Sequence, residues 1–180
     1  DKIYFTNKYS FMILQPRVSF LIPHFNHGKC ITEAINSILN QDFTNYEIII
    51  VDDASTDDSF EILQDIATKD SRVKLFQNEQ NQGTEITLNR CIELANGEFI
   101  ICRAADDLCA PKFLNKAVEL LDIHQSAGMC VGDVEFIDDD KNPSGVESLN
   151  LSKNDRFFTP DEIIHIWKSD YNIPAASAIY

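Results

Sequence analysis

Residues 46–51 limit how this chain can fold more than any other segment. Their sequence, YEIIIV, ends in a continuous apolar and largely β-branched run. A strand with one face in water shows alternating polar and apolar residues, and this segment does not. Such a run is typical of a strand buried on both faces, as in a parallel sheet that lies between layers of helices.

The rest of the chain alternates between strand and helix patterns. Apolar spacing and turn residues predict strands at 17–22, 46–51, 72–76, 98–102, 128–136 and 173–180. They predict helices at 30–41, 55–67, 83–95, 111–123 and 159–168, with 138–158 as a polar surface loop. Repeated strand–helix–strand units imply an α/β fold, a mostly parallel sheet with helices on both faces.

Several residues fit helix ends. Ser55-x-x-Asp58 and Thr159-x-x-Glu162 resemble capping boxes. Pro111 suits the first position of a helix, and Gly97 the position just past a helix end. With 180 residues the chain fits one domain, for which we expect an N-terminal extension at 1–16 and a domain at 17–180.

The formal net charge of −14 argues against a nucleic acid as partner, because nucleic-acid binding needs a basic surface. The five cysteines form no CxxC motif, and we interpret them as reduced core residues. No apolar run approaches the roughly 18 residues of a membrane span, and no signal peptide opens the chain. These features predict a cytoplasmic location and no transmembrane segment.

Two pairs of neighbouring aspartates follow predicted strands. Asp52 and Asp53 come directly after 46–51, and Asp106 and Asp107 come shortly after 98–102. Because parallel strands end at the same edge of a sheet, we expect both pairs at one rim, where such sheets bind ligands. Adjacent carboxylates suit Mg²⁺ or Mn²⁺. The alternative is that the first pair makes an Asx turn and the second an acidic helix start.

Other candidates follow the first and third predicted strands. Pro23, Phe25 and Asn26 end the first strand, where an aromatic ring can stack on a base, and a plain turn is the alternative. Asn81 and Gly83 open a helix whose backbone N–H groups can meet an anion.

Two arginines are candidate phosphate partners, because a guanidinium group matches phosphate oxygens. They are Arg90 and Arg103, and for Arg103 an ion pair with Asp106 or Asp107 is equally open. The four histidines show no spacing typical of metal ligands with the carboxylates, and we interpret them as surface or turn residues.

These motifs together resemble the family 2 glycosyltransferases, which have the Rossmann-like GT-A fold. The matching segments are VSFLIPHFN (18–26), SILNQ (37–41), YEIIIVDDASTDDS (46–59), NQG (81–83), LNRCIELANGEFI (88–100), AADDLCAP (104–111), GDVEFIDDD (132–140) and NIPAASAIY (172–180). The resemblance implies an inverting transferase that moves a sugar from a nucleoside-diphosphate donor, a UDP-sugar by expectation, to a hydroxyl of an acceptor such as a growing glycan.

The resemblance also implies roles for particular residues. Pro23, Phe25 and Asn26 would surround the nucleoside, and Asp52 would accept a hydrogen bond from the base. Asp106 would bind the ribose and, with Asp107, a Mg²⁺ or Mn²⁺ ion that bridges the diphosphate. We place Asn81, Gly83 and Arg103 in the same nucleotide-sugar set.

The chain departs from the family pattern at two points. Many relatives carry an aspartate where this chain has Ala104. No residue up to Tyr180 matches the catalytic base, so we expect the base beyond it and an incomplete acceptor side. A non-catalytic module that binds a nucleotide-sugar or glycan is therefore the alternative function, and association with the inner face of a membrane is left open.

Two other classes fit less well. A receiver-like phosphoacceptor would have its acidic pair after the first strand, and here the pairs follow later strands. A sugar-nucleotide nucleotidylyltransferase would have a glycine-rich basic loop after the first strand, where this chain has HFNHGKC.

Overall fold

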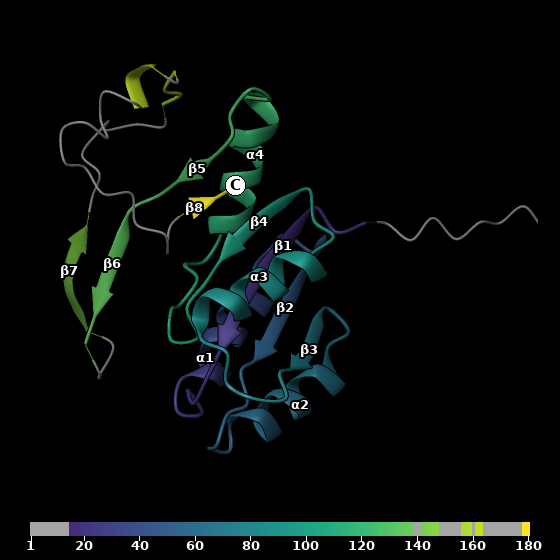
Figure 1. The fold of residues 1–180 in the computed structure, drawn as a ribbon. Helices are drawn as coiled ribbons and strands as arrows, with labels where there is room; N and C mark the ends of the chain where they lie inside the picture. The colour runs from purple at the N-terminus through teal and green to yellow at the C-terminus, as the bar shows by residue number, and fades with distance from the viewer. Residues whose placement is uncertain (1–14, 139–141, 148–155, 160, 164–177) are drawn as a thin grey trace, which may run out of the picture.

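Four parallel strands form the central sheet of the computed structural model, which describes residues 15–138, 142–147, 156–159, 161–163 and 178–180. The strands lie in the order β3-β2-β1-β4 (Figure 1). In chain order they are β1 (Val18–His24), β2 (Tyr46–Asp52), β3 (Val73–Gln77) and β4 (Phe99–Cys102). Every residue of β2 is buried, which confirms the prediction of a strand covered on both faces.

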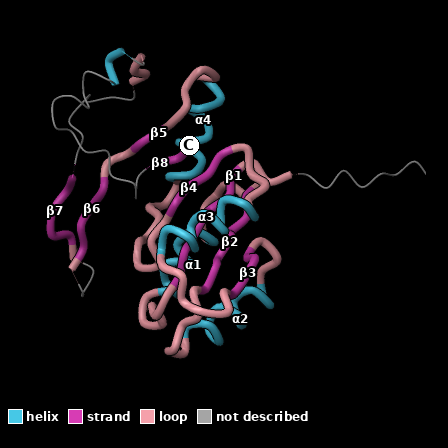
Figure 2. The backbone as a smooth tube through the Cα atoms, in the orientation of Figure 1, coloured by secondary structure: helices cyan, strands magenta, loops and turns pink. Residues whose placement is uncertain are grey.

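Helices cover both faces of this sheet. Phe20 and Ile22 of β1 pack in one hydrophobic cluster and Leu21 in a second one, because successive side chains of a strand point to opposite faces. The first cluster contains residues of α1, α2 and α4, and the second contains Cys91 of α3. From β1 to α4 the chain alternates strand and helix (Figure 2). The helices are α1 (Ile31–Leu39), α2 (Ser59–Lys69), α3 (Thr84–Leu94) and α4 (Phe113–Ile123).

Shorter strands follow α4. β5 (Cys130–Val131) pairs antiparallel with β8 (Ala178–Ile179), and Tyr180 exchanges two backbone hydrogen bonds with Ile100 of β4. β6 (Val134–Ile137) forms an antiparallel hairpin with β7 (Pro143–Glu147), to one side of the central sheet (Figure 1). The predicted strand at 128–136 is therefore divided in two, and part of the predicted loop at 138–158 is β7.

The helix starts correct two other expectations and confirm a third. Helix α4 begins at Phe113, so Pro111 lies before the helix rather than at its first position. Helix α2 begins at Ser59 after Asp58, and Ser55 does not cap it. Thr159 and Glu162 do form the predicted capping box, since each bonds the backbone N–H of the other.

The end of α3 differs from its prediction as well. The helix ends at Leu94, and Gly97 does not have the left-handed backbone of a glycine cap. A Cβ atom at Gly97 would lie 2.6 Å from the backbone nitrogen of Ser19, so close packing against β1 explains this glycine. Ile92 of this helix is 45% exposed. Cys30 is also exposed, unlike the buried Cys91 and Cys109.

The remaining predictions fall on residues outside the described ranges. They are the extension up to residue 14, the helix beyond residue 163 and the first part of the strand at 173–180. In the part of the chain that the structure describes, no helix is both long and apolar enough to cross a membrane.

The strand order marks one place in the sheet where a ligand can enter. From β1 the chain proceeds to β2 and then β3 on one side, whereas β4 lies on the other side of β1. Helices on opposite faces leave a crevice where the strand order reverses, beyond the carboxyl ends of the strands. That place lies between the ends of β1 and β4.

Candidate functional site

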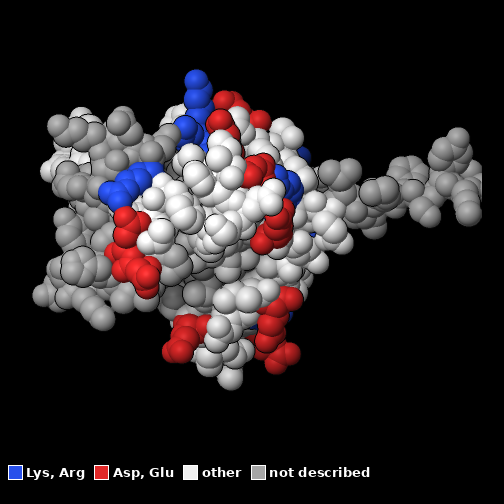
Figure 3. Space-filling model, turned by 90° about the horizontal axis from the view of Figure 1, so that it is seen from above, with Lys and Arg blue, Asp and Glu red and all other residues white. Residues whose placement is uncertain are grey.

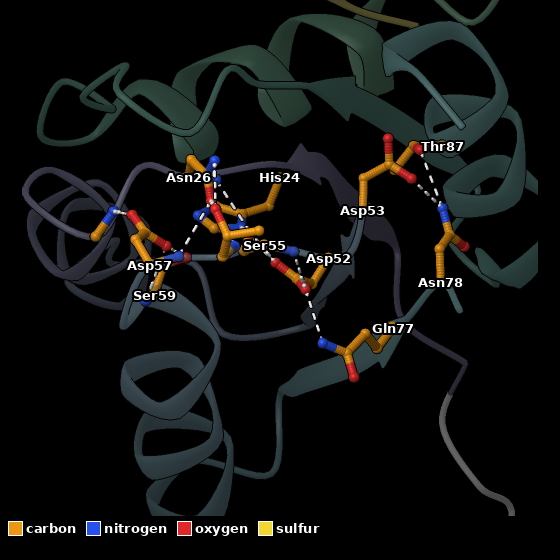
Figure 4. Close-up of polar contacts among 12 residues, drawn as sticks. His24, Asn26, Asp52, Asp53, Ser55, Asp57, Ser59, Gln77, Asn78 and Thr87 are labelled. Atoms are coloured by element: carbon orange, nitrogen blue, oxygen red, sulfur yellow. Dashed lines mark hydrogen bonds and ion pairs between the residues drawn. The ribbon is translucent and has the colours of Figure 1, made fainter. Parts of the chain in front are cut away.

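A row of polar side chains crosses the carboxyl ends of β1, β2 and β3. His24 is aligned with Asp52 in the sheet, and Asp52 with Gln77. His24 Nδ1 lies 2.9 Å from Asp52 Oδ1, and Gln77 Nε2 donates to Asp52 Oδ2 at 3.0 Å (Figure 4). Ser55 donates to Asp52 through both its hydroxyl and its backbone N–H. Asp52 is 0% exposed, so these internal partners surround it.

Asp53 points to the opposite face of the sheet, as the alternation of a strand requires (Figure 4). Its Oδ1 accepts from Asn78 Nδ2 at 2.6 Å, and its Oδ2 accepts from the N–H of Gly83 at 2.8 Å. The N–H of Gln82 donates to both oxygens. The backbone groups that we expected to meet a ligand anion at the start of α3 are thus bound by the chain's own Asp53.

Both carboxyls of this pair are stabilised in the charged form. Burial acts to raise the pKa of Asp52, but the hydrogen bonds from Ser55, His24 and Gln77 outweigh it and lower the pKa below its ordinary value. Asp53 shows the same balance, with Asn78 as its main donor. Burial lowers the pKa of His24 despite Asp52, so the contact between them is a neutral hydrogen bond rather than an ion pair.

Asn26 fixes the loop that follows β1. Its backbone is in the left-handed region with a φ of 58°, and asparagine tolerates that conformation better than most residues. Its Oδ1 accepts from the N–H of Thr56 at 2.7 Å, and its own N–H donates to Ser55 Oγ at 3.0 Å. The predicted ligand residue Asn26 therefore joins the loops after β1 and β2.

Pro23 and Phe25 lie on either side of His24. Pro23 does not end β1, since it still pairs in register with Val51. Phe25 is 40% exposed, which leaves part of its ring open to solvent at the rim. Of the predicted nucleoside contacts in this loop, the ring of Phe25 is the apolar surface that a base could reach.

Asp106 and Asp107 lie in the turn after β4 and differ from the first pair. Asp106 is exposed and Asp107 is half-buried. Burial raises the pKa of Asp107, Asp106 raises it further, and the charge of Arg103 acts in the opposite direction. Among the described residues, no side chain forms a hydrogen bond or ion pair with either carboxylate. This pair therefore carries charge that the surrounding protein compensates only in part.

The two predicted phosphate-binding arginines are both used inside the protein. Arg90 donates to the carbonyl oxygen of Gln77 at 2.8 Å and also to the side chain of Asn78. Arg103 is buried, with its guanidinium 5.3 Å from the ring centre of Phe113 and in contact with the sulfur of Cys109. Because its charge lowers the pKa of Asp107, Arg103 acts on the acidic pair from inside the protein.

His24 is the site residue that sequence reasoning missed. The prediction of a surface or turn histidine is wrong at this position, because the side chain is buried and bound to Asp52. Its place along β1 carried a signal, since Phe20, Ile22 and His24 share one face of the strand. That face is the one covered by α1, α2 and α4.

The second acidic pair fits one side of a divalent cation. Its carboxylates are neighbouring hard oxygen ligands. Burial disfavours the charged form of Asp107 and raises its pKa, with a smaller contribution from Asp106, and a bound cation would favour the charged form. Within the described ranges, no group of three His, Cys, Asp or Glu residues could hold a metal ion. Water and ligand oxygens would therefore complete the coordination shell, as is usual for Mg²⁺.

Charged side chains of both signs lie on the face of the molecule that Figure 3 shows. Figure 3 shows Asp and Glu side chains in separate groups around a mostly uncharged centre, with fewer Lys and Arg side chains on that face. The formal net charge is −14.

Comparison with known proteins decides the family. The model of the family described as "Glycosyl transferase family 2" matches residues 19–171. The chain belongs to this family. An uncharacterized glycosyltransferase of Haemophilus influenzae is 36% identical over 144 residues, which are 80% of this chain and 56% of that protein.

Solved structures confirm the GT-A fold. TarS of S. aureus in complex with UDP-GlcNAc has a TM-score of 0.58 and 33% identity, over 61% of this chain and 32% of TarS. The mannosyltransferase PcManGT of Pyrobaculum calidifontis, in complex with GDP-Man and Mn²⁺, has a TM-score of 0.56 and 27% identity, over 68% of this chain and 36% of that one. The chain thus spans less than two thirds of each of these relatives.

Proposed function

We propose that this chain binds a nucleoside-diphosphate sugar and is the donor-binding part of an inverting glycosyltransferase, with a UDP-sugar as donor and a glycan hydroxyl as acceptor. The observation that carries the proposal is the acidic pair Asp106–Asp107 at the end of β4. It lies beside the reversal of strand order, and its carboxylates lack hydrogen-bonding side chains among the described residues. Family membership and the UDP-GlcNAc complex of TarS support the donor class.

In this proposal Asp106 and Asp107 hold a Mg²⁺ or Mn²⁺ ion, which would supply positive charge against the departing diphosphate. The Mn²⁺ complex of PcManGT supports this choice of metal. The exposed ring of Phe25 stacks on the base, and Asp106 also binds the ribose. Buried Arg103 keeps positive charge behind Asp107, which opposes the rise in the pKa of Asp107 that burial causes.

The same proposal assigns a structural role to the first acidic pair, Asp52 and Asp53. Asp52 and Asp53 are saturated by internal donors, so the contact between Asp52 and the base would require a rearrangement of His24 and Gln77. We propose instead that both carboxylates fix the loops around the nucleoside. Asn26 and Gly83 act in the same way, through their bonds to Ser55 and Asp53. A cytoplasmic location, free or at the inner face of a membrane, remains part of the proposal.

Binding of UDP, UDP-GlcNAc and GDP-mannose, each with and without Mn²⁺, tests this function. We expect tightest binding for the uridine compounds, dependence on Mn²⁺, and loss of binding in Asp107→Asn. Equal binding with and without Mn²⁺ would refute the role of the acidic pair.

A second candidate is a binding module without transfer activity. The observation that favours it is Ala104, which is exposed and stands where many relatives carry an aspartate. Hydrolysis of the donor in the presence of Mn²⁺ separates the two candidates. Release of UDP from UDP-GlcNAc would support the enzyme, whereas tight binding without release would support the module.

A further inference from the structure

The loop that carries the second acidic pair is tied to the end of α1. The N–H of Cys109 donates to Ser37 Oγ at 2.8 Å. Gln41 Nε2 donates to the carbonyl oxygen of Ala110 at 2.9 Å, and Gln41 Oε1 accepts from the N–H of Leu114 at 3.1 Å. Two polar side chains near the end of one helix thus hold the segment that follows Asp107 at three backbone positions.

Both of these side chains are themselves fixed. Gln41 is only 6% exposed, and its Nε2 also donates to the carbonyl oxygen of Ser37 at 3.2 Å. Ser37 Oγ donates to the carbonyl oxygen of Ala34 at 2.7 Å, which directs an oxygen lone pair towards Cys109. Rotation of either side chain would leave buried polar groups without partners, so both hold defined positions.

Helix α4 depends on this contact because it has no local cap. The residue before the helix, Lys112, is in the left-handed region with a φ of 64°, and its side chain makes no capping bond. Leu114 carries one of the first backbone N–H groups of the helix, which need a partner from outside it. Gln41, 73 residues away in the sequence, supplies that partner.

The other end of the loop is fixed by the sheet. The N–H of Arg103 donates to the carbonyl oxygen of Leu21 at 3.0 Å, as a continuation of the pairing between β1 and β4. Asp106 and Asp107 therefore lie between one anchor on β1 and another on α1. Because no described side chain bonds their carboxylates, the backbone path between the two anchors sets their positions.

We propose that Ser37 and Gln41 are positioning residues that hold Asp106 and Asp107 in place for the donor and its cation. This inference rests on the proposed function, since it assumes that the pair binds the cation. Neither residue touches the ligand in this account. Their effect is transmitted through the backbone of Cys109, Ala110 and Leu114.

The test uses Ser37→Ala and Gln41→Ala with Ser19→Ala as the matched control. Ser19 Oγ also accepts a loop N–H at 2.8 Å, from Gly97, but at the amino end of the sheet. We measure the dissociation constant of Mn²⁺ in the presence of UDP, together with the melting temperature. Loss of an outer partner of a metal ligand typically costs 10–100-fold in affinity. We expect the dissociation constant of Mn²⁺ to rise about tenfold in Ser37→Ala and Gln41→Ala and to stay unchanged in Ser19→Ala. The melting temperature should fall in all three variants.

The outcomes separate this inference from the function on which it rests. If the unmodified chain binds Mn²⁺ and UDP, Asp107→Asn does not, and Ser37→Ala binds as well as the unmodified chain, the positioning role is wrong and the proposed function stands. Equal weakening in Ser19→Ala would also overturn the positioning role. No binding by the unmodified chain would overturn both. If Gln41→Ala fails to fold, Ser37→Ala alone decides.

Discussion

The two acidic pairs of this chain look alike in sequence and differ in physical state. Asp52 and Asp53 are buried and accept hydrogen bonds from side chains and backbone on both faces of the sheet. Asp106 and Asp107 lie partly in solvent, and among the described residues no side chain bonds their carboxylates. The pKa of Asp52 is lowered, whereas that of Asp107 is raised.

This difference separates a structural role from a binding role. A carboxylate with all its lone pairs occupied by internal donors stabilises the fold and has little left to offer a ligand. A carboxylate whose charge is poorly compensated is stabilised when a cation binds beside it. On this argument the first pair shapes the rim and the second pair binds there.

The largest expected effect is the loss of stability in Asp52→Ala. The substitution leaves donors of His24, Ser55 and Gln77 without their acceptor. The buried His24 donor costs about 1–3 kcal/mol when it is left without a partner, and each of the other two lost hydrogen bonds costs about 1 kcal/mol. We expect the free energy of unfolding in urea to fall by about 3 kcal/mol or more. Asp106→Ala is the matched control, because its carboxylate is exposed, and should change stability by less than about 0.5 kcal/mol. Equal losses in both variants would remove the distinction between the pairs.

Asp107→Asn should show the opposite pattern. The charged carboxylate is unfavourable where it lies, so its neutral amide should leave the melting temperature at pH 7 unchanged or raise it. Binding of Mn²⁺ with UDP should weaken by at least the ~10–100-fold that loss of an outer partner costs. Calorimetric titration gives the affinity for Mn²⁺, and thermal melting of the same preparation gives the melting temperature. A variant that melts earlier and still binds Mn²⁺ would reverse our assignment.

The stability of the fold and the binding of Mn²⁺ should also depend on pH in different ways. Folded His24 has a lowered pKa, so its contribution to stability is present above its ordinary value of 6.5 and is lost as the pH falls towards the folded value. Asp52 and Asp53, also lowered, lose theirs as the pH falls below 3.8. Asp107 is raised, so it takes up its proton above 3.8, which adds slightly to stability there but removes a metal ligand.

We therefore expect Mn²⁺ binding to be lost on acidification at a pH where the chain is still folded. Urea unfolding and Mn²⁺ titration at the same series of pH values measure the two curves. If binding persists until the far-ultraviolet circular dichroism signal collapses, the raised pKa of Asp107 does not control it.

The smallest expected effect concerns Gln77. Gln77→Ala removes one of the donors to Asp52 at an exposed position, and we expect a loss of about 1 kcal/mol in the free energy of unfolding. The affinity for Mn²⁺ should not change, because Gln77 bonds Asp52 of the first pair and not the pair that binds the cation. A tenfold change in the affinity for Mn²⁺ would mean that both acidic pairs contribute to cation binding, which contradicts the separate roles assigned to them.

Much of this fold could be predicted from the sequence because its strongest signals are local. The apolar run before Asp52, the helical spacing in α1 and the alternation of strands and helices all report on neighbouring residues. The failures were at ends and edges. Pro111 was expected to start α4, but the helix start depends on Gln41, which is far away in the sequence.

The site could be predicted only in part, for a similar reason. Both acidic pairs were expected at the rim, and both follow strands there. Which pair is saturated depends on His24, Gln77 and Asn78 from neighbouring strands, and on Ser55 in the loop after β2. A pattern of residues in one segment carries no information about such partners, so the sequence could not show that internal donors occupy Asp52, which was expected to contact the base.

The most direct test is the position of Mn²⁺ in crystals of this chain grown with UDP and manganese chloride, located by its anomalous scattering. We predict a single strong peak within coordination distance of the Asp107 carboxylate, beside Asp106, with the bond between Asp52 and His24 intact. A peak at Asp52 or Asp53, or UDP bound at the rim with no manganese beside Asp107, would contradict the account.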